Sequence, residues 1–80
     1  MKRVDLTQMK EGEEGKVVEL RGGYGFLKRL QVLGVKEGKI IKKISHQLFR
    51  GPVVIQTGNT QIALGFGMAK KIIVEVKEGD

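Results

Sequence analysis

Short runs of β-branched and other apolar residues, bounded by glycine-rich turns, dominate the hydrophobic pattern of this chain. Runs of this kind occupy residues 16–20, 53–57, 60–64 and 72–76. Their length, their composition and the Gly, Pro or Asn residues beside them predict β-strands. Gly58-Asn59 separates two of these runs, and a two-residue connection of this composition predicts a tight β-hairpin.

The spacing of apolar residues changes between residues 24 and 33. Phe26, Leu30 and Leu33 recur at the spacing of one helix face. This pattern predicts one short amphipathic helix, with Leu30 and Leu33 as core residues. Gly34 follows directly, and glycine readily adopts the left-handed conformation that ends many helices.

Three further segments have less regular patterns. Residues 39–49 are extended but alternate imperfectly, which predicts a strand with a bulge or a strong bend. Residues 65–70 are too short and glycine-rich for an independent helix, and we expect a single helical turn there. Residues 6–15 form a leading segment that Leu6 and Met9 anchor to the core.

Together these elements predict a mainly β fold in a single domain that spans residues 1–80. We expect about five strands, one short helix after the first strand and a brief turn before the last. An open sheet of this size leaves its edges and much of its apolar surface in contact with water. The strands are therefore expected to close into a small β-barrel.

The composition excludes several classes of functional site. The chain has no Cys and a single His, His46, so disulfides, zinc fingers, iron–sulfur clusters and Cys nucleophiles are excluded. A lone imidazole binds first-row metals weakly. Gly23-Tyr24-Gly25 and Gly65-Phe66-Gly67 lack the third glycine of a dinucleotide fingerprint. We expect no metal site, no cofactor and, because so short a chain has little volume for a deep cleft, no enzymatic activity.

The hydrophobic pattern contains no targeting or membrane-spanning segment. Residues 1–5 are charged, but no long apolar stretch follows them, so they do not predict a signal peptide. Residues 51–69 carry no charge, yet polar side chains in their middle forbid a lipid-facing span. We therefore expect a cytoplasmic protein that does not insert directly into a membrane.

The positive charge is concentrated in the middle of the chain. The net charge is +6, and residues 21–50 contain eight Lys or Arg against one Glu. Two interpretations remain open: a solvated basic surface, or a surface that docks an acidic or membrane-adjacent partner. The residues that we expect to form this partner-binding surface are Lys28 and Arg29 on the helix, with Lys42 and Lys43 on the following strand. Neighbours on a strand point to opposite faces, so only one of Lys42 and Lys43 can join the helix residues.

A basic chain of this size also raises nucleic acid as a partner. Tyr24 alone makes a poor stacking platform for single-stranded bases, because Phe26 belongs to the apolar face of the helix. A small basic nucleic-acid-binding barrel is therefore the alternative function, and we consider nucleic acid an unlikely partner.

Several segments in a fixed order resemble the FeoA family of ferrous iron transport proteins. They are the run Leu30-Gln31-Val32-Leu33-Gly34-Val35-Lys36-Glu37-Gly38-Lys39-Ile40-Ile41, the turn Gly51-Pro52, the run Ile62-Ala63-Leu64, and the residues Ala69, Ile72 and Val74. The resemblance extends over nearly the whole chain.

The resemblance implies an SH3-like β-barrel and a non-catalytic role in iron homeostasis. It implies that the chain is an accessory to FeoB, a membrane transporter of Fe²⁺ with a cytosolic G domain. At the level of the family it implies transition metal ion binding, but it carries over no metal ligand and no catalytic residue. The resemblance is compatible with a homo-oligomer.

Overall fold

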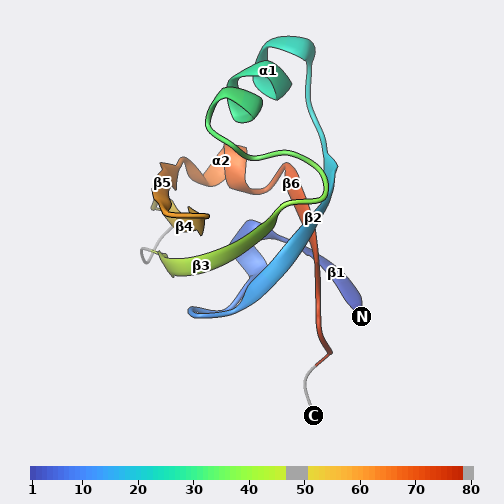
Figure 1. Cartoon of the computed structure of the whole chain (residues 1–80), viewed down its shortest axis with the longest axis vertical. Coiled ribbons are helices and arrows are strands. Elements are labelled where there is room, and N and C mark those ends of the chain that lie inside the picture. Colours follow the sequence, from blue (N-terminus) through green and yellow to red (C-terminus); the bar gives the residue numbers. More distant parts are fainter. Residues whose placement is uncertain (47–50, 79–80) are drawn as a thin grey trace.

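The computed structural model describes residues 1–46 and 51–78, and its centre is one antiparallel β-sheet (Figure 1). The strands are β1 (Lys2–Asp5), β2 (Glu14–Leu20), β3 (Ile40–His46), β4 (Val53–Thr57), β5 (Thr60–Leu64) and β6 (Ile72–Val76). The helices are the 3₁₀ helix η1 (Leu6–Gln8), α1 (Tyr24–Val32) and α2 (Phe66–Ala69). The strand order across the sheet is β1-β6-β2-β3-β4-β5.

The mainly β composition and most of the expected elements are confirmed. Strands β4, β5 and β6 have the expected bounds, and β2 begins two residues earlier than expected. The single helical turn expected within residues 65–70 is α2. The strand expected over residues 39–49 corresponds to β3, although residues 47–49 lie outside the described residues.

The structure contains one strand that the hydrophobic pattern did not predict. This strand is β1, which has the sequence Lys-Arg-Val-Asp and forms one edge of the sheet. It pairs with β6, with Arg3 opposite Glu75 and Val4 opposite Val74. A strand at a sheet edge often carries charged side chains, so β1 lacks the apolar run by which strands are found. Within the described residues the sheet therefore has six strands rather than five.

The sheet curls around the core but is open among the described residues. Its edges are β1 and β5, and these two strands do not pair with each other there. Strand β2 pairs with β3 on one side and with β6 on the other, with a register shift between Val17 and Glu19. Such bulges increase the local twist, which lets one sheet curve around a core without complete closure. The expected full closure is therefore not seen.

The core fills the concave side of this curled sheet. It includes the inward-facing side chains of β4 and β5, which alternate with more exposed residues. Leu6 and Met9 from the leading segment are 0% and 2% exposed, so their expected role as anchors is confirmed. The buried residues of this hydrophobic core are Leu6, Met9, Val17, Leu30, Val35, Ile41, Val53, Ile55, Ile62, Leu64, Ala69, Ile72, Val74 and Val76.

The end of α1 explains why one expected core residue is correct and the other is wrong. Gly34 has φ +90°, and its N–H donates to the Gln31 carbonyl at 3.0 Å. The Val35 N–H donates to the Leu30 carbonyl at 2.9 Å, which completes a Schellman motif. Leu30 and Val35 are both fully buried, whereas Leu33 is 38% exposed. The chain reverses after Val32, so Val35 rather than Leu33 reaches the core beside Leu30.

Two other local expectations are confirmed. Thr57 pairs with Thr60 across the Gly58-Asn59 turn, where Gly58 has φ +61°. The register between β3 and β4 shifts between Lys43 and Ser45, as the imperfect alternation of that segment predicted.

Candidate partner-binding surface

Helix α1 projects from one end of the molecule (Figure 1). Leu30 is its one fully buried side chain, and Phe26 and Leu27 are half-buried. The remaining side chains point to solvent. We call the side chains of Tyr24, Lys28, Arg29 and Val32 the α1 outer face.

The α1 outer face combines apolar and positively charged groups. Tyr24 is 78% exposed and Val32 is 80% exposed, although both have large apolar side chains. Tyr24, Lys28 and Val32 follow one another at four-residue intervals, which places them on one stripe of the helix. The sequence pattern identified the two cations but not Val32, although Val32 follows Lys28 by four residues and therefore lies on the same side of the helix.

The local surroundings of Lys28 and Arg29 do not neutralise their charges. The Lys28 Nζ lies 5.8 Å from the centre of the Tyr24 ring, a cation–π contact across one helical turn. Arg29 lies in the last turn of α1, where the helix dipole favours a positive charge. Neither Lys28 nor Arg29 forms a salt bridge with an acidic residue of the described part of the chain.

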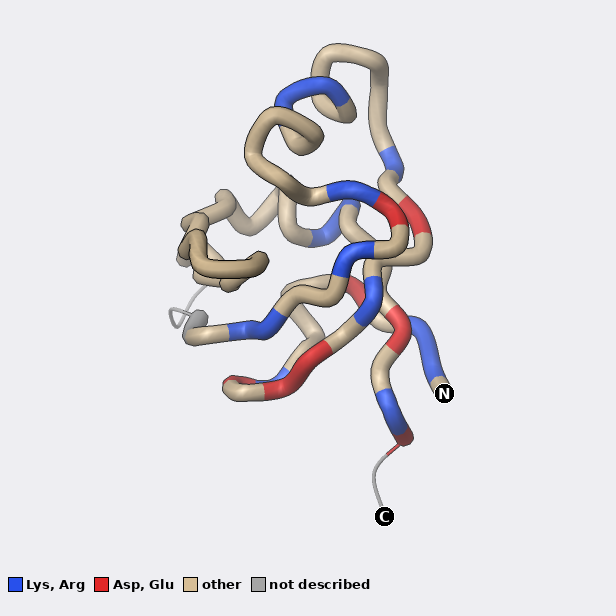
Figure 2. The backbone as a smooth tube through the Cα atoms, in the orientation of Figure 1, with Lys and Arg blue, Asp and Glu red and all other residues tan. Residues whose placement is uncertain are grey.

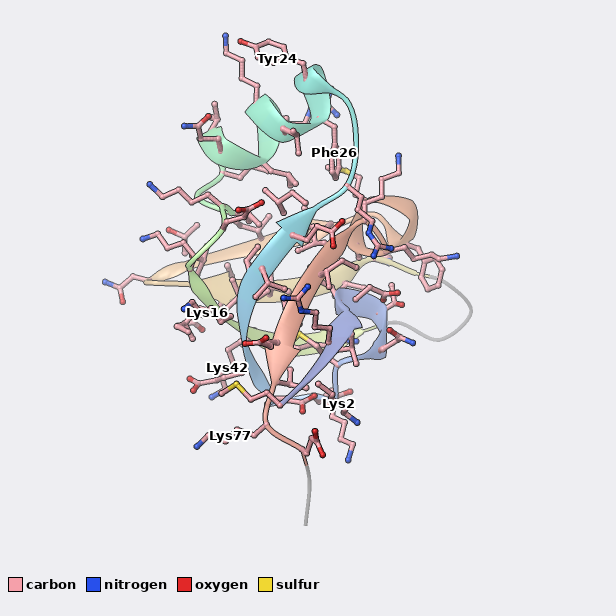
Figure 3. The ribbon with its side chains drawn as sticks, turned by 90° about the vertical axis from the view of Figure 1, so that its right-hand side faces the viewer. Lys2, Lys16, Tyr24, Phe26, Lys42 and Lys77 are labelled. Carbon is pink, nitrogen blue, oxygen red and sulfur yellow. The ribbon has the colours of Figure 1, made fainter. Side chains whose placement is uncertain are left out.

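Lys42 is exposed, but it lies far from the α1 outer face. Figure 3 shows Tyr24 at the tip of α1 and Lys42 well down the sheet, on the side where Lys16 and Lys77 are labelled. On β3, Lys42 is paired opposite Glu14 of β2. Both line a shallow cavity of about 330 Å³ that also includes Glu13 and Lys77. The surroundings of Lys42 are therefore of mixed charge, and Lys42 does not extend the basic surface of α1.

Lys43 is buried, which corrects its expected place on the partner-binding surface. Its side chain is 0% exposed, and its Nζ donates to the carbonyls of Leu6 at 2.8 Å, Thr7 at 3.2 Å and Met9 at 2.8 Å. These carbonyls belong to η1 and the residue after it, where free acceptors remain at a helix end. The alternation of β3 turns Lys43 inward, so its ammonium group serves the core rather than a partner.

Burial also changes the acidity of this ammonium group. It lowers the pKa of Lys43 from 10.5, because the protein interior disfavours the charged form. The carboxylates of Asp5, Glu11 and Glu13 act in the opposite direction and do not cancel the effect of burial. Of the four residues expected to bind a partner, Lys28 and Arg29 thus share one surface, Lys42 lies apart and Lys43 is internal.

The structure adds an apolar groove beside α1 that the sequence analysis missed. The groove has a volume of about 350 Å³, and its apolar lining comes from Leu20, Leu27 and Val35. Gln31, Lys36 and Glu37 form the rest of its lining. The helix and the strands must be packed together before these residues meet, so no local pattern in the sequence marks the groove.

Residues 1–46 and 51–78 lack the features of a metal centre and of a membrane-spanning helix. No group of three or more His, Cys, Asp and Glu side chains in those residues could hold a metal ion. None of the helices formed by those residues combines the length and the apolar character that crossing a bilayer requires. The His46 side chain lies outside the part of the chain that the structure describes.

The fold is of the SH3-like class. Comparison with known proteins also identifies the family to which the chain belongs. Residues 4–76 match the FeoA domain model. The chain therefore belongs to the FeoA domain family. A relative named "Putative Fe(2+) transport protein A", from Methanocaldococcus jannaschii, is 44% identical over 73 residues, which cover 91% of this chain and 87% of the relative.

Solved structures support the same assignment. A crystal structure of an iron uptake regulatory protein, FeoA, superposes with a TM-score of 0.84 at 29% identity, covering 94% of this chain and 97% of that one. A manganese-dependent transcriptional repressor superposes with a TM-score of 0.85, but it is 17% identical and 42% of its chain is covered. This second likeness concerns the fold alone.

Proposed function

We propose that this chain is a cytoplasmic accessory protein of ferrous iron uptake, and that it acts without catalysis by binding an FeoB-type membrane transporter. The α1 outer face binds the cytosolic G domain of that transporter. Two exposed apolar side chains, Tyr24 and Val32, lie on one projecting helix beside two cations that have no acidic partner among the described residues, and this observation carries the proposal. Membership of the FeoA domain family and the name of the archaeal relative support a role in Fe²⁺ transport.

The chemistry of the α1 outer face suits a protein partner with an acidic surface. Tyr and Arg are enriched in protein interfaces, because each combines a broad apolar surface with a polar group. Exposed Val32 adds apolar area that a partner can remove from water. Lys28 and Arg29 supply the charge that orients an acidic partner before contact.

The test measures co-sedimentation of the purified chain with membranes that contain or lack the transporter. We expect the parent chain to bind the transporter-containing membranes alone. Reversal of both cations, Lys28→Glu with Arg29→Glu, should weaken this binding by roughly tenfold or more, because like charges then face each other. Val32→Ser should weaken it without a change of charge.

Lys42→Glu is the matched control, because it reverses an exposed cation that lies away from α1. We expect it to bind nearly as well as the parent. Binding of the double reversal at the parental level would refute the α1 outer face as the docking site. Equal binding of the parent to both kinds of membrane would refute the transporter as the partner.

Nucleic acid is less well supported as a partner than it was from the sequence alone. Lys43 is buried and Lys42 is separated from α1, so the described part of the basic middle of the chain does not form one continuous track for a phosphate backbone. A titration with a generic single strand at physiological salt tests this alternative. A dissociation constant tighter than roughly micromolar would favour nucleic acid over the transporter.

A further inference from the structure

Among the described residues, strand β5 forms an edge of the sheet without the usual protection against pairing with another chain. Edge strands are commonly protected by charged side chains, Pro or bulges. Residues 51–69 contain no Asp, Glu, Lys or Arg, and β5 contains no Pro. Its register with β4 is regular from end to end. The opposite edge, β1, carries Lys2, Arg3 and Asp5.

The hairpin geometry identifies which backbone groups of β5 are free. In a hairpin with a two-residue turn, the flanking residues, here Thr57 and Thr60, form a hydrogen-bonded pair. Hydrogen-bonded and non-bonded pairs then alternate along β4 and β5. The N–H and C=O groups of Gln61 and Ala63 therefore point away from β4. Both residues are exposed, and neither makes another backbone hydrogen bond within the described residues.

We propose that two copies of this chain pair through β5 in an antiparallel dimer. A two-fold axis at Ile62 places Gln61 of one copy opposite Ala63 of the other. Each such pair exchanges two hydrogen bonds, so the dimer satisfies all four free groups on each edge. This register also places the exposed side chains of Gln61 and Ala63 beside each other, and the buried Ile62 beside its counterpart in the other copy.

The distribution of charge favours a second copy over other occupants. Figure 2 shows the β4 and β5 region free of the Lys, Arg, Asp and Glu colours that mark the rest of the tube. Pairing through β5 therefore brings two neutral regions together, and the charged parts of the two copies lie on the outer sides. An acidic or basic segment of another protein would find no complementary charge on this edge. Pairing also stops at two copies, because the charged β1 edges remain outside.

The dimer should be weak, because two strands of five residues bury much less surface than a stable complex requires. Specific stable interfaces bury about 800 Å² on each partner. We therefore expect a dissociation constant of roughly 0.1–1 mM, in the range of transient contacts. The dimer would therefore form where several copies of the chain are held close together, rather than in dilute solution.

The test compares amide NMR spectra of the full chain between roughly 0.02 and 1 mM, together with sedimentation at both ends of the range. We expect concentration-dependent shifts centred on Gln61, Ile62 and Ala63, with a rise in mean molecular mass. Amide exchange at Gln61 and Ala63 should slow at the higher concentration. Unchanged β5 signals and a constant monomer mass would overturn the proposal.

Two variants separate pairing through β5 from association through another surface. Ala63→Pro removes an outward N–H without removing a hydrogen bond to β4, and it should abolish the concentration dependence. Gln61→Lys should do the same by charge repulsion across the axis. Gln56→Lys is its matched control, since Gln56 lies opposite Gln61 on β4 but away from the edge.

The outcomes of these variants are distinct. Loss of dimerisation in Gln61→Lys and its retention in Gln56→Lys would support the proposal, even if Ala63→Pro does not fold. Equal dimerisation of both Lys variants and the parent would overturn it. Concentration-dependent shifts that map to α1 instead of β5 would also overturn it, and would place self-association on the α1 outer face.

Discussion

At the scale of single residues, Lys43 shows how a charged side chain can belong to the core. Its ammonium group replaces water with three backbone carbonyls, so both the charge and the acceptors have partners. The hydrogen bonds join β3 to the chain around η1, which is distant in sequence. This contact fastens the leading segment of the chain, including Leu6 and Met9, to the sheet.

Replacement of Lys43 by Met should destabilise the fold by about 1.5–3 kcal/mol, the usual contribution of hydrogen bonds to a charged group. The Met side chain fills similar space, but it leaves the carbonyls of Leu6, Thr7 and Met9 without their donor. The free energy of unfolding in urea measures the effect. Lys42→Met is the matched control and should change stability by less than about 0.5 kcal/mol, because Lys42 is exposed. Equal stability of the two variants would contradict the role assigned to Lys43.

The lowered pKa of Lys43 gives its contribution a definite dependence on pH. Between this lowered value and 10.5, the unfolded chain binds more protons than the folded chain. The free energy of unfolding therefore rises with pH across that interval. The stability advantage of the parent over Lys43→Met should grow as the pH increases toward 10.5, and urea titrations at several alkaline pH values measure it. An advantage that stays constant or shrinks would show that burial does not lower this pKa.

At the scale of elements, α1 is tied to the sheet through few side chains, and Leu30 is the central one. Leu30→Ala should cost about 2–4 kcal/mol, because it removes a fully buried side chain and leaves a cavity. Leu33→Ala removes the same atoms at a position that is 38% exposed, and it should cost less than about 1 kcal/mol. Thermal melts of both variants measure the difference. Similar melting temperatures would mean that the two leucines pack alike.

Sequence patterns predicted the elements whose signals are local. The Gly58-Asn59 turn, the β-branched run of β4 and the Gly34 helix end each depend on a few neighbouring residues. Strand β1 was missed because pairing with β6, rather than an apolar run, makes it a strand. Strands β1 and β6 lie near opposite ends of the sequence, so no short stretch of residues contains both.

The candidate site was predicted only in part, because some of its features depend on local spacing and others on contacts between residues that are distant in sequence. Lys28 and Arg29 lie on the solvent side of α1, because the helical period places Lys28 nearly opposite Leu30 and turns Arg29 about 100° away from it. The inward direction of Lys43 depends on the alternation and register of β3, which its pairing with β2 and β4 determines. The separation between Lys42 and α1 likewise depends on how the helix and the sheet pack, which charge counts along the chain do not contain.

At the scale of the whole molecule, the charges and the uncharged hairpin lie on different parts of the surface (Figure 2). The basic α1 outer face projects from one end of the molecule, whereas the uncharged β5 edge belongs to the β4–β5 hairpin. The two proposed contacts therefore use separate surfaces, so a second copy at β5 leaves α1 accessible to a transporter. Variants at Gln61 and at Lys28 should then act independently.

The positive charge of α1 should act mainly on the rate at which the partner is found. Electrostatic attraction speeds the encounter of oppositely charged surfaces, and salt reduces it because the Debye length is about 8 Å at physiological ionic strength. The association rate of the parent with the transporter should therefore fall as salt is raised, while the dissociation rate changes little. Reversal of Lys28 and Arg29 should slow association and remove most of this salt dependence, whereas Lys42→Glu should retain it. Stopped-flow or surface-based kinetics over a salt series measure both rates. If the double reversal and Lys42→Glu lose the same share of the salt dependence, the net charge of +6 attracts the partner as a whole and α1 has no special part in the encounter.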